Sequence, residues 1–419
     1  MPESETMTPS TTLLIHGGNS AIAGVLQPVH MRIAGSTIAT ITPATNSPQA
    51  DGATAQLDAT GCTLLPGMID VHVHGAVGAD TMDAEPVALG RMARFFAHHG
   101  VTSFLPTTLT ATPEATLAAV KAVAAAGDFP HPRGAASLGV HLEGPYINPR
   151  FPGAQLPDAI RPPDLAEFEA LCAAGPVRMI TLAPEIPGAF ALIQKARAQG
   201  ILTVIGHSAA TYEECEAGIA AGISQATHTY NAMTGLHHRQ PGTLGSVLTN
   251  DTVYAQLIAD NVHVHPAAMN ILARCKGVAR TLLITDAMRA AGFPAGHYDL
   301  GGQGVRVVSG KNGGECRLAD GTLAGSVLTL ERGVANFSKA TGIDLVQAWN
   351  AASLSPAMAL GQAHQRGQLA PNYLADVVLL DDAGEVAATV IQGRVVYLRE
   401  PERLCANGGN HEPDGPGSL

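Results

Sequence analysis

Eight short apolar runs alternate with alanine-rich segments along the middle of this 419-residue chain. Strand-like runs separated by helix-like stretches are typical of βα units with a parallel sheet covered on both faces. Eight such units are the number that closes a (β/α)8 barrel. The runs are 68–74, 102–107, 138–144, 178–184, 201–207, 224–228, 254–260 and 281–287. We therefore predict an α/β fold built on a TIM-type barrel.

The two ends of the chain carry short β-like pieces instead, such as HMRIAGSTIATI near the start and ATVIQGRVVYL near the end. These pieces flank the barrel on both sides in sequence. We therefore predict that residues 11–66 and 368–400 form a small β-sandwich domain, and that residues 67–367 form the barrel. The glycine-rich segment 292–324 is expected to be a loop or hairpin over the mouth of the barrel.

Composition narrows the class of protein. With 46% hydrophobic and 14% charged residues the chain is globular rather than disordered. A formal net charge of -11 disfavours nucleic acid or an acidic membrane surface as the main partner. The cysteines stand singly, and the start lacks the basic and apolar segments of a secretory signal. We expect a soluble, cytoplasmic protein that acts on small molecules, with polar tails before Thr11 and after Ala406.

Two histidines stand one residue apart inside the first run, PGMIDVHVHG. Alternate side chains of a strand share a face, so His72 and His74 point the same way. Burying an imidazole without a partner costs on the order of a few kcal/mol, so a shared partner is expected, and a divalent metal is the usual one. A pair of hydrogen-bonded core histidines is the competing interpretation.

Four further runs end on a residue that can bind metal or move a proton. In chain order these are Glu143, His207, His228 and Asp286. Barrels of this type build their active sites at the C-terminal ends of the strands. Any one residue has a structural explanation, such as helix N-capping for Asp286. Together with His72 and His74 there are six such residues at one end of the barrel, and six do not arise easily from packing. We therefore predict a metal site there.

Imidazole and carboxylate ligands without thiolate suit Zn²⁺, Fe²⁺ or Mn²⁺. A metal held mainly by neutral imidazoles lowers the pKa of bound water to about 7, which favours hydrolysis. A carboxylate beside the metal must also accept the proton of that water and pass it to the leaving group. Asp286 suits this role.

Motifs along the chain carry a resemblance to a known family. They include PGMIDVHVHG, HLEGPYINP, GHSAATYEE, THTYNAMTGLHHRQPG, TDAM and LAGSVLTLERGVAN. In this order and spacing they resemble the N-acetylglucosamine-6-phosphate deacetylases of the amidohydrolase superfamily, from about Thr12 to Tyr397. The resemblance implies a (β/α)8 barrel with a β-sandwich made from both chain ends. It also implies removal of the acetyl group of the sugar phosphate, with release of acetate and glucosamine 6-phosphate.

The resemblance also implies roles for the strand-end residues. The principal metal, Zn or Fe, would be held by Glu143, His207 and His228. Because some members that retain HxH bind two ions, His72 and His74 would hold a second one, with Glu143 as a bridge. Asp286 would activate water and then protonate the departing amine.

Substrate binding is implied for a second group of residues. The phosphate would be held by Arg239 and His263, with Asn231 and the backbone N–H of Ala232. The fork of donors on Arg239 matches phosphate oxygens, although from the residues alone it is a surface cation. In the family this arginine reaches the neighbouring subunit's site, which implies a homodimer. Gln155 stands where some members carry a histidine thought to hydrogen-bond the substrate carbonyl, and an amide can donate there but cannot become an imidazolium.

Three alternatives stay open. The enzyme could prefer the galactosamine epimer of the substrate, which differs at one hydroxyl. It could act on a cyclic amide or nucleobase, although the run 178–184 lacks the lysine that dihydroorotase-like sites take from the fourth strand. A non-catalytic metal-binding or sugar-phosphate-sensing protein would not require Asp286. We expect His237, His238 and His265 to be loop residues outside the metal site.

Overall fold

The computed structural model describes residues 12–22, 25–45, 54–127, 134–310 and 314–405. The predicted tails before Thr11 and after Ala406 lie outside these residues. Among the described residues, no helix combines the length and the apolar character needed to cross a bilayer.

Eight parallel strands form the barrel, one at each predicted run. They are β7 (Met68–Val73), β10 (Val101–Thr108), β12 (Val140–Glu143), β13 (Val177–Leu182), β14 (Leu202–Ile205), β15 (Ile223–Ala226), β16 (Tyr254–Ile258) and β17 (Thr281–Ile284). Each pairs with the next from β7 to β17, and the short β11 (Ala136–Ser137) also pairs with β10. The predicted barrel is confirmed.

The barrel closes between β17 and β7 through side chains and loop backbone rather than a regular ladder. The N–H of Asp286 donates to the carbonyl of His72 at 3.0 Å. The Asp70 carboxylate accepts from the Thr285 hydroxyl at 2.5 Å. These bonds tie the end of the last strand to the strand that carries both histidines of HxH.

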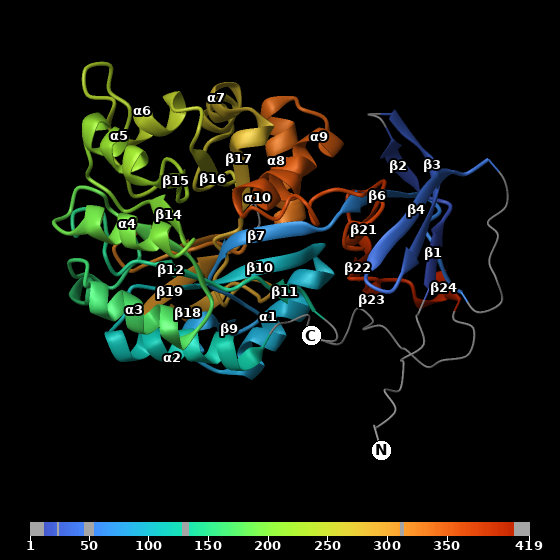
Figure 1. The fold of residues 1–419 in the computed structure, drawn as a ribbon, viewed down its shortest axis with the longest axis horizontal. Helices are drawn as coiled ribbons and strands as arrows, with labels where there is room; N and C mark the ends of the chain where they lie inside the picture. Colours follow the sequence, from blue (N-terminus) through green and yellow to red (C-terminus); the bar gives the residue numbers. More distant parts are fainter. Residues whose placement is uncertain (1–11, 23–24, 46–53, 128–133, 311–313, 406–419) are drawn as a thin grey trace.

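Helices cover the outside of the barrel (Figure 1). They are α1 (Pro86–His98), α2 (Pro113–Ala126), α3 (Leu165–Ala174), α4 (Ala189–Ala198), α5 (Tyr212–Ala221), α6 (Gly242–Thr249), α7 (Pro266–Lys276), α8 (Leu330–Thr341), α9 (Leu345–Trp349) and α10 (Leu354–Ala359). Local sequence determines where several begin. Thr211 and Glu214 form a capping box at α5, and Thr112 caps α2.

Both chain ends form a separate sheet domain at one side of the barrel (Figure 1). Its strands are β1 (Thr12–His16), β2 (Asn19–Ile22), β3 (Val25–Ala34), β4 (Thr37–Pro43), β5 (Ala55–Asp58), β6 (Cys62–Pro66), β21 (Val377–Asp381), β22 (Val386–Ile391), β23 (Arg394–Leu398) and β24 (Leu404–Cys405). β6 pairs antiparallel with β21 and so joins the two ends. Residues from β1, β3 and β5 share one apolar core with residues from β21, β22 and β23, as in a β-sandwich.

The exact domain boundaries stay a prediction. β24 lies beyond residue 400, the limit set from the sequence, and pairs with β5.

A small antiparallel sheet lies at the mouth of the barrel, as segment 292–324 predicts. It consists of β18 (Gly296–Leu300), β19 (Gln303–Val308) and β20 (Glu315–Arg317). Leu300, Thr322 and Leu323 of this segment line the cavity that opens at the C-terminal ends of the barrel strands. The insertion therefore forms one wall of the site. A two-stranded piece, β8 (Gly75–Ala76) and β9 (Ala79–Asp80), follows β7 directly.

Candidate active site

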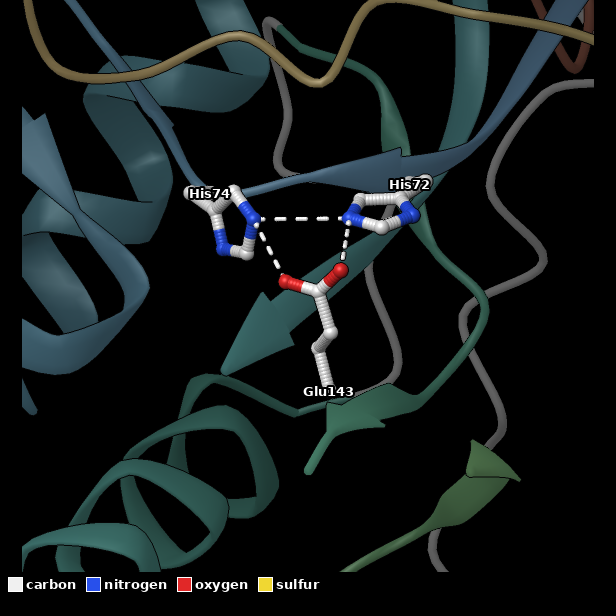
Figure 2. A group of neighbouring side chains, drawn as sticks. All are labelled: His72, His74 and Glu143. Carbon is white, nitrogen blue, oxygen red and sulfur yellow. Dashed lines mark hydrogen bonds and ion pairs between the residues drawn. The ribbon is translucent and has the colours of Figure 1, made fainter. Parts of the chain in front are cut away.

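The predicted metal ligands converge on the carboxylate of Glu143. The Nε2 atoms of three histidines lie close to its Oε1: His72 at 3.3 Å, His207 at 3.3 Å and His228 at 3.2 Å. Nε2 of His74 lies 3.2 Å from Oε2. Figure 2 shows how His72 of β7 and His74, directly after it, face the carboxylate of Glu143 at the end of β12.

These residues form two clusters that share Glu143. One contains His72, His74 and Glu143, and the other contains Glu143, His207 and His228. In each cluster the ligand atoms lie within 4.8 Å of one another, and all the side chains are buried. Nitrogen and oxygen donors from separate strands aimed at one point fit a divalent cation, because packing alone does not require buried polar atoms to converge.

The outer nitrogens of three imidazoles are held by oxygen acceptors. Nδ1 of His74 lies 3.2 Å from the Thr107 carbonyl, and Nδ1 of His207 lies 2.9 Å from the Phe151 carbonyl. Nδ1 of His72 lies 3.2 Å from Oε1 of Gln256. In a neutral imidazole, an oxygen acceptor keeps the proton on Nδ1, which leaves the Nε2 lone pair facing the shared centre. This tautomer is the one that a metal ligand needs.

Three site residues adopt a left-handed backbone immediately after their strands. The φ angles are 47° at His207, 25° at His228 and 49° at Asp286. Such a conformation costs a residue with a Cβ about 1–3 kcal/mol and persists only where the surroundings impose it. Three of the residues predicted to carry the chemistry are therefore held in a strained backbone conformation.

The environment keeps both carboxylates of the site ionised. Burial raises the pKa of Glu143, but His72, His207 and His228 outweigh burial and hold this pKa well below its ordinary value. Burial likewise raises the pKa of Asp286, and the neighbouring His72 and His74 bring it below the ordinary value. An ionised Glu143 can bind a cation, and an ionised Asp286 can accept a proton.

Asp286 faces the cavity beside the clusters. Its Oδ1 lies 3.2 Å from Nε2 of His74 and 3.5 Å from Nε2 of His72. No helix begins directly after Asp286, since β17 leads into turns and then β18, and the next α-helix along the described chain begins at Leu330. The N-capping interpretation of Asp286 is therefore wrong.

A cavity of about 450 Å³ opens above the clusters. Its wall contains several predicted residues: His74, Glu143, Gln155, His207, His228, Asn231, Ala232, His263 and Asp286. This volume lies in the range of small-molecule sites. Asn231, Ala232 and His263, the predicted phosphate ligands other than Arg239, therefore face the same cavity as Asp286.

Arg239 does not line the cavity of its own chain. Its side chain is exposed, and Nη1 lies 2.7 Å from Nε2 of the neighbouring His238. His237 and His238 are exposed loop residues, and His265 caps α7 through a bond from the Ala267 N–H at 3.1 Å. The reach of Arg239 into a neighbouring subunit stays a prediction.

The structure adds residues that the sequence reasoning missed. The Asp260 carboxylate accepts from Nδ1 of His263 at 2.7 Å and orients that imidazole. Glu185 accepts from the Ser208 hydroxyl at 2.8 Å and from the Asn148 amide at 2.9 Å, and so ties two site loops together. Asp260 and Glu185 both lie just after a barrel strand, and the same position in the sequence identified the predicted metal ligands. Arg150 also lines the cavity, and no sequence signal distinguished it.

The profile of the Amidohydrolase family matches residues 63–396. The chain belongs to the amidohydrolase family. Among related amidohydrolases, N-acetylgalactosamine-6-phosphate deacetylase of Escherichia coli O157:H7 is 41% identical over 374 residues, which is 89% of this chain and 96% of the relative. N-acetylglucosamine-6-phosphate deacetylase of Vibrio furnissii is 41% identical over 336 residues, or 80% of this chain and 83% of the relative.

Solved amidohydrolase structures agree with these relatives. The Mycobacterium smegmatis N-acetyl-D-glucosamine-6-phosphate deacetylase, solved in complex with N-acetyl-D-glucosamine-6-phosphate, superposes with a TM-score of 0.83 at 32% identity. The alignment covers 92% of this chain and 99% of that one. The deacetylase from Pasteurella multocida gives a TM-score of 0.85 at 28% identity, with 92% and 99% covered. The resemblance to this deacetylase family is confirmed.

Proposed function

We propose that this amidohydrolase cleaves the acetamide of N-acetyl-D-glucosamine 6-phosphate and releases D-glucosamine 6-phosphate and acetate. The observation that carries the proposal is the Asp286 carboxylate beside two buried ligand clusters, at the base of a cavity of about 450 Å³. Membership of the deacetylase family supplies the reaction class. Acetate release from this substrate, with protein of measured metal content, is the direct test.

Glu143, His207 and His228 would hold the principal ion, Zn²⁺ or Fe²⁺. When bound, such an ion supplies Lewis acidity that polarises the acetamide carbonyl and acidifies water. Asp286 accepts a proton from the attacking water, whose oxygen bonds to the carbonyl carbon. As the C–N bond breaks, Asp286 returns that proton to the amine nitrogen, so the carboxylate is ready for another cycle.

A second ion would be held by His72 and His74, with Glu143 as the bridge. The membership of Glu143 in both ligand clusters supports this, because its two oxygens together face all four histidines. Metal analysis of protein reloaded with Zn²⁺ or Fe²⁺ gives the number of ions per chain. A maximum of one ion with both histidines intact would contradict the two-ion site.

The sugar phosphate would lie between the clusters and a group of phosphate ligands. These ligands are Asn231, the backbone N–H of Ala232, His263 and Arg239 of a second subunit. Support for the second subunit comes from the exposed position of Arg239 outside its own cavity. The protein would then be a homodimer. The six cysteines are all free, which suits a cytoplasmic location.

A mixture of two variants tests whether Arg239 acts between subunits. Asp286→Asn protein lacks the proton acceptor, and Arg239→Ala protein lacks the phosphate ligand. In a hybrid dimer, the Arg239→Ala subunit keeps Asp286 and receives an intact arginine only if the residue crosses the interface. If Arg239 acts across the interface, co-expression of the two variants should give some sites with the KM of the parent protein. If all the activity shows the raised KM of Arg239→Ala, Arg239 does not act across the interface.

The galactosamine epimer is the second candidate substrate, because the E. coli O157:H7 relative with that name matches this chain as well as the glucosamine-named relative does. Parallel assays with the two epimers and the unphosphorylated sugar decide the preference. Cyclic amides and nucleobases are less well supported, because β13, the fourth barrel strand, contains no lysine and the shared carboxylate comes from β12.

A further inference from the structure

Gln155 bridges two strand ends at the base of the cavity. Its side chain is only 4% exposed, although the residue belongs to the loop that follows β12. Its Oε1 accepts a hydrogen bond from the Thr110 N–H at 2.7 Å, and its Nε2 donates to Oε2 of Glu143 at 2.6 Å. The amide therefore connects the loop after β10 to the carboxylate that both ligand clusters share.

The orientation of this amide follows from its partners. A backbone N–H can only donate, so the amide oxygen must face Thr110. The amide NH₂ then faces Oε2 of Glu143 and donates to it. The reversed amide would place oxygen against oxygen and N–H against N–H, so both neighbours select the same rotamer.

The bond to Gln155 determines how the carboxylate is rotated. Glu143 Oε2 contacts Gln155 and His74, which leaves Oε1 for His72, His207 and His228. Rotation about the last bond of a glutamate has only a broad energy minimum, so the side chain alone does not maintain this division. A buried hydrogen-bond donor on Oε2 maintains this division of contacts, because the donor occupies one of the lone pairs of that oxygen.

We propose that Gln155 is a positioning residue for Glu143: it strengthens cation binding by Glu143, His207 and His228, and its main contact is this carboxylate rather than the substrate carbonyl. The inference rests on the proposed function only in that these clusters bind a divalent ion. The chemistry is specific to the residue present here, because the same amide must accept from Thr110 and donate to Glu143.

Zinc affinity of Gln155→Leu tests the proposal. Leucine has a similar size but cannot donate, so Glu143 loses its donor and becomes free to rotate. Loss of a hydrogen-bond partner of a metal ligand typically weakens metal binding about 10–100-fold. Metal-free protein titrated with Zn²⁺ against a coloured chelator should show a decrease of that size for the tighter ion. Gln155→Asn, whose shorter side chain cannot reach both partners, should also bind Zn²⁺ more weakly.

Gln303→Leu is the matched control. Gln303, at the start of β19, donates to the carbonyl of Ala154 at 2.6 Å, so this variant removes an amide that contacts the same loop but not Glu143. Its zinc affinity should equal that of the parent, and thermal melting of all three variants checks that they fold.

Parent-like zinc affinity in both Gln155 variants would overturn the proposal, and a raised KM in those variants would then assign Gln155 to the substrate. Equal losses in Gln155→Leu and Gln303→Leu would also overturn it, by showing a general effect of the loop. Because the titration contains no sugar, it reads the role of Gln155 even if the protein fails to deacetylate the proposed substrate.

Discussion

The two ends of the cavity are built in different ways. At the base, the strand-end cluster consists of Glu143, the four histidines that face it and Asp286, all buried and placed at or just after barrel strands. At the opening, the rim consists of Arg150, Asn231, Ala232 and His263, which lie on loops. Strands hold the base at fixed distances, whereas loops can change in sequence and shape without disturbing it. The base therefore suits the chemistry common to a family, and the rim suits the choice of substrate.

The largest expected effect is at the base. Asp286→Asn removes the proton acceptor but keeps the shape, and general acid–base catalysis contributes about 10²–10⁴-fold. The turnover number should fall by that factor while metal content stays at the parent level. Acetate release and metal analysis of the same sample check both parts, and an active variant would remove Asp286 from its role.

Glu143→Gln should damage metal binding rather than turnover alone. The substitution removes the negative charge that both clusters share, so zinc affinity should fall by more than the about 10–100-fold expected for a hydrogen-bond partner of a ligand. Glu331→Gln is the control, because Glu331 is a buried carboxylate paired with His99 at 2.8 Å, away from the clusters. Full metal occupancy in Glu143→Gln under chelator competition would contradict the ligand role.

Substitutions of the arginines that could contact the phosphate should change substrate binding instead. A hydrogen bond to a charged group contributes about 1.5–3 kcal/mol, so Arg239→Ala should raise KM for the sugar phosphate about tenfold or more, with little change in the turnover number. KM for the unphosphorylated sugar should not change. Arg150→Ala is the matched variant, because Arg150 is the arginine that lines the cavity within one chain. A rise in KM for Arg150→Ala alone would move the phosphate contact to this residue.

The smallest effect expected is a pH dependence at the rim. Burial lowers the pKa of His263, but the hydrogen bond and charge of Asp260, with a contribution from Asp286, outweigh burial and Arg317 and raise this pKa above its ordinary value. The imidazolium therefore persists to a higher pH than usual and is lost above the raised pKa. KM for the sugar phosphate should rise a few-fold as the pH rises through the pKa of His263. His263→Gln should remove this pH dependence of KM. Identical pH profiles in parent and variant would exclude it.

The base of the cavity was predictable because strand geometry is regular. Eight alternating units determine a barrel, side chains two residues apart on a strand share a face, and residues at the C-terminal ends of the strands meet at one end of the barrel. His72 and His74 could therefore be placed beside Glu143, His207 and His228 before any coordinates were known. The same regularity placed Asp286 at this end of the barrel.

Contacts that depend on loop conformation could not be obtained this way. Gln155 reaches Glu143 because the loop after β12 folds back over the end of that strand. Because the geometry of a strand repeats every two residues, the position of a side chain follows from its place in the sequence. A loop has no such period, so its packing against the other loops decides what each of its side chains touches.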